Sequence, residues 1–273
     1  MSLFVASLNS GSNGNCYYIG NEQEAVLIDA GISCREIETR MARLGLSLRK
    51  VKAIFVSHEH TDHIRGIEVL SRKYRIPVYI TPLTQQNGRL ILDSDLQKPF
   101  FADKPINIGD LQITPFTKLH DAVHPHSFSI ARGEIKVGVF TDIGDVCENL
   151  IAHFKQCHAA FLETNYDEEL LENGSYPYHL KRRIRGGLGH LSNTQALALF
   201  TAHKPDYMTH VFLSHLSKDN NRPQLVLELF NTHALGTEII IASRFAETRV
   251  YHITGEENTT PKALSAGLQF SLF

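Results

Sequence analysis

The chain has 273 residues with a formal net charge of −2, 42% hydrophobic residues and 21% charged residues. This composition is ordinary for a globular protein, and the balanced charge excludes a general attraction to nucleic acid, so a polyanion would need a local basic patch. No apolar run reaches transmembrane length, the N-terminus lacks a signal-peptide pattern, and the four cysteines show no disulfide-scaffold spacing. These features favour a cytoplasmic protein without a membrane partner.

The predicted strands come in two batches, each followed by helices. The first batch has expected strands at 3–8, 15–19, 25–28, 53–56 and 78–81, with helices at 35–44, 64–74 and 84–92. The second has expected strands at 111–119, 127–131, 135–141, 159–162, 207–214, 238–242 and 248–253, with helices at 146–156, 192–202 and 223–235 and an irregular segment after 163. No linker divides the batches, so residues 1–255 are expected to form one α/β domain, a four-layer αββα sandwich.

The most informative stretch is 51–63, VKAIFVSHEHTDH. An apolar run typical of a buried strand is followed by four metal-type side chains within six residues, His58, His60, Asp62 and His63. Imidazoles and carboxylates are preferred ligands of divalent first-row metals. We expect the H-x-H pair to chelate one ion and Asp62 with His63 to begin a second site. The alternative is a chance cluster of surface histidines, which this spacing at a strand end disfavours.

Residues of the same chemical types follow five other predicted strands: Asp29, His120, Asp142, Glu163 and His215. Sites in α/β sheets form at the carboxyl ends of strands, so these residues are expected to face one shared cleft. Taken singly, each could instead be a turn residue, a helix cap or a structural histidine. The sequence alone leaves open whether the strand ends meet.

The H-x-H-x-D-H motif after a buried strand resembles the metallo-β-lactamase-fold hydrolases. Later residues resemble the YycJ (WalJ)-like branch, which is related to ribonuclease Z and the β-CASP nucleases, and the resemblance covers nearly the whole chain. It implies the αββα fold and two divalent metal ions, with zinc, manganese and iron all open. The implied ligands are His58, His60, His120 and Asp142 for one ion, and Asp62, His63, Asp142 and His215 for the other. It also implies that Asp29 supports the metal loop by hydrogen bonding.

The implied reaction is hydrolysis of a phosphodiester bond by a metal-bridged hydroxide, with Asp62 counted among the catalytic residues. Glu163 in FLETNYD and His190 in GLGHLSN resemble a ribonuclease Z pair in which the histidine protonates the leaving oxygen and the glutamate orients it. Both could instead be structural, as a cap and a residue preceding a helix. The branch implies a 5′-to-3′ exonuclease acting on DNA in repair or replication. Rival functions are a metal-dependent ester, thioester or lactone hydrolase, and a non-catalytic DNA-binding protein.

A basic run precedes His190 and contains Lys181, Arg182, Arg183 and Arg185. These cations are candidate phosphate contacts, although short charge runs are usually solvated helix faces. The loop 10–15 could form a backbone nest for a phosphate, or simply a tight hairpin turn. Tyr166 stands where many YycJ-like sequences have histidine. His124 and His126 have no assigned role, and surface placement is expected for both.

The C-terminal residues 256–273 are expected to form a flexible tail. Its last five residues, QFSLF, resemble the peptide with which bacterial DNA enzymes dock on the replication sliding clamp. The contacts would be Gln269, Leu272 and Phe273. The alternative is a final edge strand that folds onto the domain.

Overall fold

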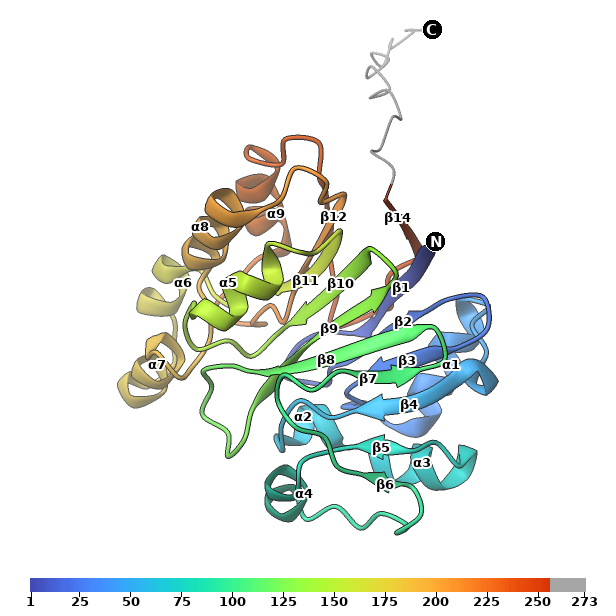
Figure 1. Ribbon diagram of the computed structural model, residues 1–273. Coiled ribbons are helices and arrows are strands. Elements are labelled where there is room, and N and C mark those ends of the chain that lie inside the picture. The colour runs from blue at the N-terminus through green and yellow to red at the C-terminus, as the bar shows by residue number, and fades with distance from the viewer. Residues whose placement is uncertain (256–273) are drawn as a thin grey trace, which may run out of the picture.

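The computed structural model describes residues 1–255, which form two mixed sheets that lie face to face between two layers of helices (Figure 1). The first sheet has the strand order β14-β1-β2-β3-β4-β5-β6, and the second has the order β13-β12-β11-β10-β9-β8-β7. The predicted αββα sandwich is confirmed. The expected clamp contacts Gln269, Leu272 and Phe273 lie outside the described residues.

The element bounds in the described residues are as follows. The strands are β1 (Ser2–Asn9), β2 (Cys16–Gly20), β3 (Ala25–Ile28), β4 (Val51–Phe55), β5 (Val78–Tyr79), β6 (Gln97–Lys98), β7 (Ile106–Ile108), β8 (Leu111–Thr117), β9 (His126–Arg132), β10 (Ile135–Phe140), β11 (Ala159–Glu163), β12 (His210–Ser214), β13 (Glu238–Ile241) and β14 (Tyr251–Thr254). The helices are α1 (Cys34–Arg43), α2 (Thr61–Ile64), α3 (Ile67–Tyr74), α4 (Pro82–Gly88), α5 (Glu148–Phe154), α6 (Glu168–Asn173), α7 (Tyr178–Arg185), α8 (Asn193–His203) and α9 (Pro223–Asn231), with a 3-10 turn at Leu48–Lys50.

The central strands are apolar along their whole length because both of their faces are covered. In β3, Val26 and Ile28 point into the core between the sheets, whereas Leu27 points to the helices outside. Facing residues of the second sheet, such as Phe128 and Val137, complete the inner core. This two-sided burial explains why continuous apolar runs, rather than alternating ones, mark these strands in the sequence.

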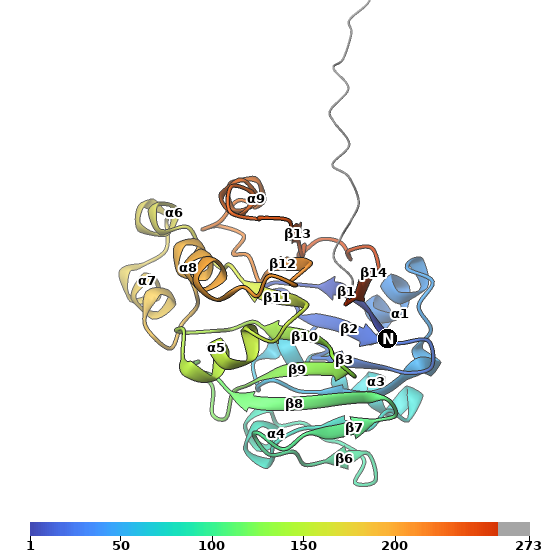
Figure 2. The same cartoon turned by 45° about the horizontal axis from the view of Figure 1, so that its top comes forward.

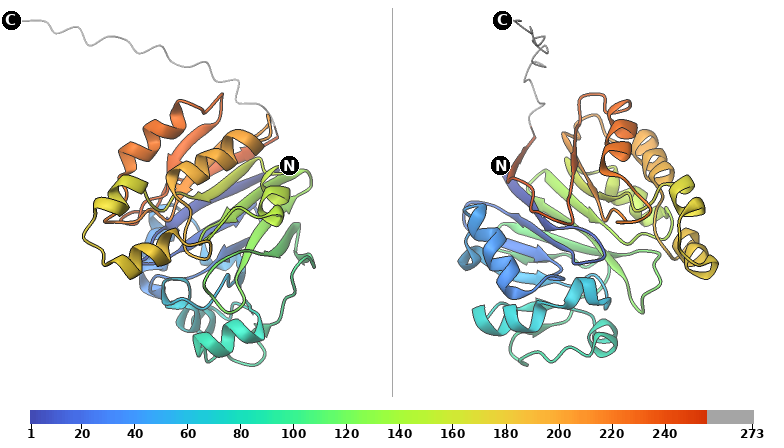
Figure 3. Two further views of the ribbon diagram at one scale, coloured as in Figure 1. Left: turned by 90° about the vertical axis from the view of Figure 1, so that its left-hand side faces the viewer. Right: turned by 180° about the vertical axis from the view of Figure 1, so that it is seen from behind.

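Helices form the two outer layers (Figure 3, right). Helices α1 and α3 cover the first sheet through residues such as Ile37 and Leu70. On the second sheet, α5, α8 and α9 bury Phe154, Phe200 and Phe230. Figure 2 shows α6 to α9 gathered on one side of the molecule and α1 on the other. None of the helices within residues 1–255 combines the length and apolar character needed to cross a membrane.

The single helix expected at 64–74 is wrong, because the chain forms two helices, α2 and α3, separated at Gly66. The Gly66 N–H donates to the Ala30 carbonyl at 2.7 Å. A Cβ at Gly66 would lie 2.2 Å from the Ile32 oxygen, so only glycine permits this approach. The break lets α2 start at Thr61 and carry Asp62 and His63 against the β3 end.

The expected irregular segment after 163 is also wrong, because it contains α6 and α7. The Asp167 side chain caps α6 by accepting a hydrogen bond from the Leu170 N–H at 3.0 Å. The helix expected at 84–92 runs instead over Pro82–Gly88, because Thr81 supplies its N-cap and proline occupies its first turn. The predicted capping box of Ser192 with Gln195 is present at the start of α8.

Candidate metal centre

The carboxyl ends of β4, β8, β10 and β12 bring the predicted ligands together. One group of donor atoms comes from His58, His60 and His120, and another comes from Asp62, His63 and His215. Asp142 belongs to groups with members of both, and within each group the donor atoms lie within 4.8 Å of one another. Side chains far apart in sequence therefore lie close together, as the pattern of strand ends predicts.

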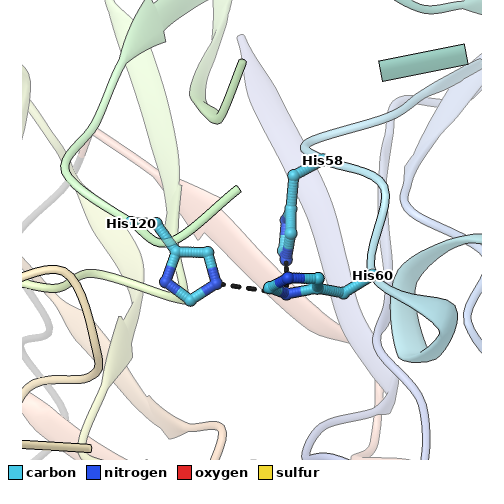
Figure 4. A group of neighbouring side chains, drawn as sticks. All are labelled: His58, His60 and His120. Carbon is cyan, nitrogen blue, oxygen red and sulfur yellow. Dashed lines mark hydrogen bonds between the residues drawn. The ribbon is translucent and has the colours of Figure 1, made fainter. Parts of the chain in front are cut away.

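The first group consists of three imidazoles that point toward one another (Figure 4). His58 Nε2 lies 3.0 Å from His60 Nδ1, and His120 Nε2 lies 3.3 Å from the same atom. The other ring nitrogens are turned outward. His58 Nδ1 lies 2.9 Å from the Ser57 hydroxyl, and His120 Nδ1 donates to the Gly189 carbonyl at 3.0 Å. These outer contacts place the ring protons on Nδ1 and leave the inward Nε2 lone pairs free.

This donor set fits a divalent cation. Two inward lone pairs, on His58 and His120, approach one nitrogen of His60, which can donate at most one proton, so the neutral rings do not satisfy one another. Asp142 Oδ2 and His215 Nε2 are buried atoms without a hydrogen-bond partner within residues 1–255. Unpartnered lone pairs of this kind cost free energy, which a bound cation would recover.

The second group is supported by the buried carboxylate of Asp29. Its Oδ1 accepts from the Ser57 N–H at 2.8 Å, and its Oδ2 accepts from His63 Nδ1 at 2.7 Å. The proton of His63 is therefore held on Nδ1. Its Nε2 faces Asp142 Oδ2 at 3.1 Å and Asp62 Oδ2 at 3.6 Å. These contacts are the ones that the predicted supporting role of Asp29 requires.

The two groups differ in their effect on protonation. Burial lowers the pKa of His120 to about 3, although Asp142 opposes the change. Burial alone would also lower the pKa of His63, but the carboxylates of Asp142, Asp29 and Asp62 outweigh it and raise this pKa to about 10. The first group disfavours a positive charge on its rings, whereas the second attracts positive charge.

Glu163 is fully buried, and all of its hydrogen-bonding capacity is used. Oε1 accepts from His190 Nδ1 at 2.8 Å and from His215 Nδ1 at 3.0 Å. Oε2 accepts from the Ile143 N–H at 2.5 Å and the Leu191 N–H at 3.5 Å. Burial would raise the pKa of Glu163, but the neighbouring His190 and His215 hold it at about 2. The ionised carboxylate therefore orients both rings and leaves their Nε2 atoms facing away from it.

Three of these residues take the left-handed backbone conformation directly after their strands. The φ angles are 60° at Asp29, 55° at Asp142 and 57° at His215. This conformation costs a non-glycine residue roughly 1–2 kcal/mol, and such strain tends to concentrate at functional sites. Asp142 and His215 belong to the donor groups, and Asp29 accepts from His63.

Sequence reasoning missed the contribution of the loop between β1 and β2. Asn15 Nδ2 lies 3.2 Å from Asp62 Oδ2 and 3.0 Å from His63 Nε2. The Ser10 hydroxyl accepts from the His215 N–H at 2.8 Å. Two N–H groups of this loop already have partners, because Gly11 N–H donates to Asn15 Oδ1 and Gly14 N–H donates to the Gly11 carbonyl. The loop supports the second group of donors.

The predicted phosphate contacts all lie on α7, but most already have partners. Arg183 pairs with Asp121 at 2.5 Å, and Arg185 pairs with Glu172 at 2.7 Å. The Lys181 ammonium donates to the Glu172 carbonyl. Arg182 is exposed and forms no ion pair within residues 1–255. Four free cations are therefore not present, and Arg182 offers the most accessible charge of the run.

Asp121 is a second residue that the sequence did not reveal. Its Oδ1 lies 3.5 Å from His120 Nε2 and is buried without a hydrogen-bond partner within residues 1–255. Its other oxygen holds Arg183, so α7 is tied to the imidazole group through one carboxylate. The spacing of 62 residues between Arg183 and Asp121 gives no local sequence signal of this pairing.

The unassigned residues are mostly internal. Surface placement is wrong for His126, which is fully buried, packs edge-on against Phe100 with ring centroids 5.0 Å apart, and donates from Nδ1 to the His124 carbonyl. Tyr166 is buried in a small apolar cluster with Leu171 and Ile184. Neither residue belongs to the donor groups at the strand ends.

Comparison with known proteins agrees with this architecture. A profile of the metallo-β-lactamase superfamily matches residues 10–143. Exodeoxyribonuclease YycJ of Bacillus anthracis is 34% identical to this chain over 228 residues, which cover 82% of this chain and 86% of that protein. The chain belongs to the metallo-β-lactamase superfamily. The predicted resemblance to the YycJ-like branch is confirmed.

Two further proteins agree with this result, one in sequence and the other in fold. Exodeoxyribonuclease WalJ of Streptococcus pneumoniae serotype 2 is 34% identical over 223 residues, covering 80% of this chain and 83% of that protein. The crystal structure of the metallo-β-lactamase fold protein YhfI from Bacillus subtilis superposes with a TM-score of 0.72 at 16% identity, covering 92% of this chain and all of that one. This member of the metallo-β-lactamase superfamily is a metal-dependent hydrolase, and its clustered histidines and aspartates can hold the divalent metals that the superfamily typically binds.

Proposed function

We propose that this hydrolase is a dinuclear phosphodiesterase that degrades DNA as a 5′-to-3′ exonuclease in repair or replication. The observation that carries the proposal is the Glu163–His190 pair, which lies beside the two converging donor groups with a 2.8 Å hydrogen bond. The names of the relatives YycJ and WalJ, both exodeoxyribonucleases, support a DNA substrate. The expected docking of residues 269–273 on a sliding clamp stays a prediction.

Two ions would be held by the converging donors. His58, His60 and His120 would bind the first, Asp62, His63 and His215 would bind the second, and Asp142 would reach both. When bound, zinc, manganese or iron would supply an activated water and neutralise negative charge on the phosphate. Asp29 and Glu163 would keep the rings of the second group in the tautomer that binds.

His190 would act as the proton donor to the leaving sugar oxygen. Its Nδ1 is occupied by Glu163, and its side chain remains 18% exposed, so Nε2 is the nitrogen left for a substrate. The ionised Glu163 stabilises the protonated ring and fixes its direction. His190 Nδ1 also lies only 3.8 Å from Asp142 Oδ1, which places the ring at the edge of the donor groups.

Helix α7 would contact the phosphate backbone through Arg182 first, since that side chain has no competing ion pair in the described part of the chain. Arg183 would join it by exchanging Asp121 for a phosphate. Both contacts are electrostatic and carry no sequence preference. An exonuclease needs this kind of recognition because it must accept any sequence.

The test is the His190→Ala variant, assayed on 5′-labelled single-stranded DNA and on a nucleotide p-nitrophenyl ester. Turnover of DNA should fall roughly 10²–10⁴-fold, as expected for loss of a general acid. The nitrophenyl ester should be hydrolysed at nearly the normal rate, because its leaving group needs no proton. The control is His233→Ala, which removes an exposed histidine at the end of α9.

Equal loss on both substrates would contradict the proton-donor role. If the unaltered protein cleaves no polynucleotide but hydrolyses a lactone, thioester or carboxylic ester, the rival hydrolase function replaces the proposal. RNA assayed beside DNA, and labels at each end, would decide the polymer and the polarity of cleavage.

A further inference from the structure

The loop that joins β13 to β14 presents an uncovered aromatic ring. Phe245 is 76% exposed, and the Arg244 guanidinium lies 6.0 Å from the centroid of its ring. At this exposure the ring gains little burial energy from the fold, so its face is available to a ligand. A ring beside a cation is a common binding surface for nucleobases.

The loop is held firmly although its ring is exposed. The buried Arg40 side chain donates to the Phe245 carbonyl at 3.4 Å and to the Leu8 carbonyl at 2.7 Å. Glu247 lies 4.0 Å from the same guanidinium, and it pairs with Arg43 at 3.0 Å. The ring is therefore presented by an ordered backbone, which reduces the entropy that binding would cost.

This loop lies against the second donor group. The Asn13 amide donates to the Arg244 carbonyl at 2.8 Å, and Ser10 N–H donates to the Ser243 carbonyl at 3.1 Å. The hydroxyl of the same Ser10 accepts from the His215 N–H. One serine thus contacts both the loop and a predicted metal ligand. The backbone of the Phe245 loop is therefore linked to His215 through Ser10.

A second cation stands at the same edge. Arg65 is exposed and donates from Nη1 to the Asn13 carbonyl at 3.3 Å, so both Arg65 and Arg244 contact Asn13 of the β1–β2 loop. Within residues 1–255 it forms no ion pair with a carboxylate. Helix α7 lies at the other group of donors, since Arg183 is bonded to Asp121 beside His120. Cations therefore lie near both donor groups.

We propose that Phe245, Arg244 and Arg65 form a nucleotide subsite that binds single-stranded nucleic acid beside the scissile phosphate. A base stacks on the Phe245 ring, and the two guanidinium groups contact backbone phosphates. This inference rests on the proposed function. Helix α7 borders only the imidazole group, and the subsite would bind the part of the nucleic-acid strand that passes the second donor group. The subsite acts in binding, without a role in the chemical step.

The experiment measures kcat and KM on a series of single-stranded oligonucleotides of increasing length, together with a mononucleotide p-nitrophenyl ester. Phe245→Ala should raise KM about tenfold for the longer oligonucleotides, which corresponds to the loss of one stacked base. It should leave kcat and hydrolysis of the mononucleotide ester unchanged. Phe245→Trp should keep KM as low as in the unaltered protein, since tryptophan offers a larger stacking face.

A matched control is Tyr74→Ala. Tyr74 is also a partly exposed aromatic residue beside a cation, with Lys73 at 5.4 Å from its ring, but it ends α3 and its hydroxyl donates to Glu38 of α1 at 2.9 Å. Its removal should leave KM unchanged for every length. Arg65→Ala and Arg244→Ala should each lower the slope of log affinity against log salt by about 0.7, the value for one phosphate contact on a single strand.

The outcomes separate the two proposals. If the unaltered protein binds and cleaves no oligonucleotide, the proposed function fails. If it cleaves them and Phe245→Ala has the KM of the unaltered protein at every length, the subsite is wrong while the proposed function stands. An equal rise in KM for the Tyr74→Ala control would also overturn the subsite.

Discussion

The two halves of the candidate metal centre use different chemistry. In the first half, His58, His60 and His120 are rings whose pKa values are lowered by burial. In the second half, burial would lower the pKa of His63 and His215 as well, but nearby carboxylates, Asp142 foremost, raise both. The first half offers neutral nitrogen donors, and the second depends on negative charge. Nitrogen donors suit zinc, whereas carboxylate donors also suit manganese and iron.

The strongest test of this contrast is Asp142→Asn, because Asp142 faces both halves. Asparagine tolerates the left-handed backbone at this position, so the substitution removes charge without adding strain. We expect loss of both ions and at least about a 100-fold loss of metal affinity. Removal of an outer-sphere partner already lowers metal affinity roughly 10–100-fold, and removal of a direct ligand should lower it at least as much. Elemental analysis after dialysis and a hydrolysis assay would measure it.

The matched control is Asp110→Asn, which removes a carboxylate whose side chain is 71% exposed and distant from the strand ends that carry the donors. Its metal content and turnover should be normal. Retention of two ions by Asp142→Asn would show that the halves do not share this residue.

An intermediate effect is expected when one half is altered alone. His60→Ala should remove the ion of the imidazole half, and Asp62→Asn should remove the ion of the carboxylate half, each leaving about one ion per chain. Calorimetric titration with zinc and with manganese would distinguish them. Asp62→Asn should weaken manganese binding more than zinc binding, and equal weakening of the two metals by both variants would erase the proposed contrast.

The smallest effect is expected from Asn15→Ala, which removes the amide that contacts Asp62 and His63. We expect about tenfold weaker binding of the second ion, which is the low end of the effect of an outer-sphere partner. Binding of the first ion should not change. The control is Asn107→Ala, an exposed asparagine in β7. If Asn15→Ala weakened binding of the first ion, the loop would support the imidazole half, and the expectation would be contradicted.

Much of this fold could be predicted because burial on both faces forces apolar runs onto the central strands, as in 25–28, where predicted and observed bounds coincide. The break at Gly66 could not be predicted. It depends on close approach to Ile32 and Ala30, which is a tertiary contact. Helices α6 and α7 were missed because they are short, and α7 buries only Ile184.

The candidate site divides in the same way. Donors such as His58 and Asp142 can be recognised because a metal site requires particular side chains at strand ends, and this requirement gives a pattern that is visible in the sequence. The supporting residues Asn15 and Asp121 give no such pattern. Asn15 lies in a glycine-rich loop whose sequence is typical of any turn. The role of Asp121 depends on Arg183, which is distant in sequence and which the fold brings beside it.

The most direct test of a two-ion centre is anomalous diffraction from crystals of the protein loaded with manganese. A two-ion centre predicts two peaks. One should lie among His58, His60 and His120 and one among Asp62, His63 and His215, with Asp142 contacting both ions. A single peak, or ions bound away from these side chains, would contradict it.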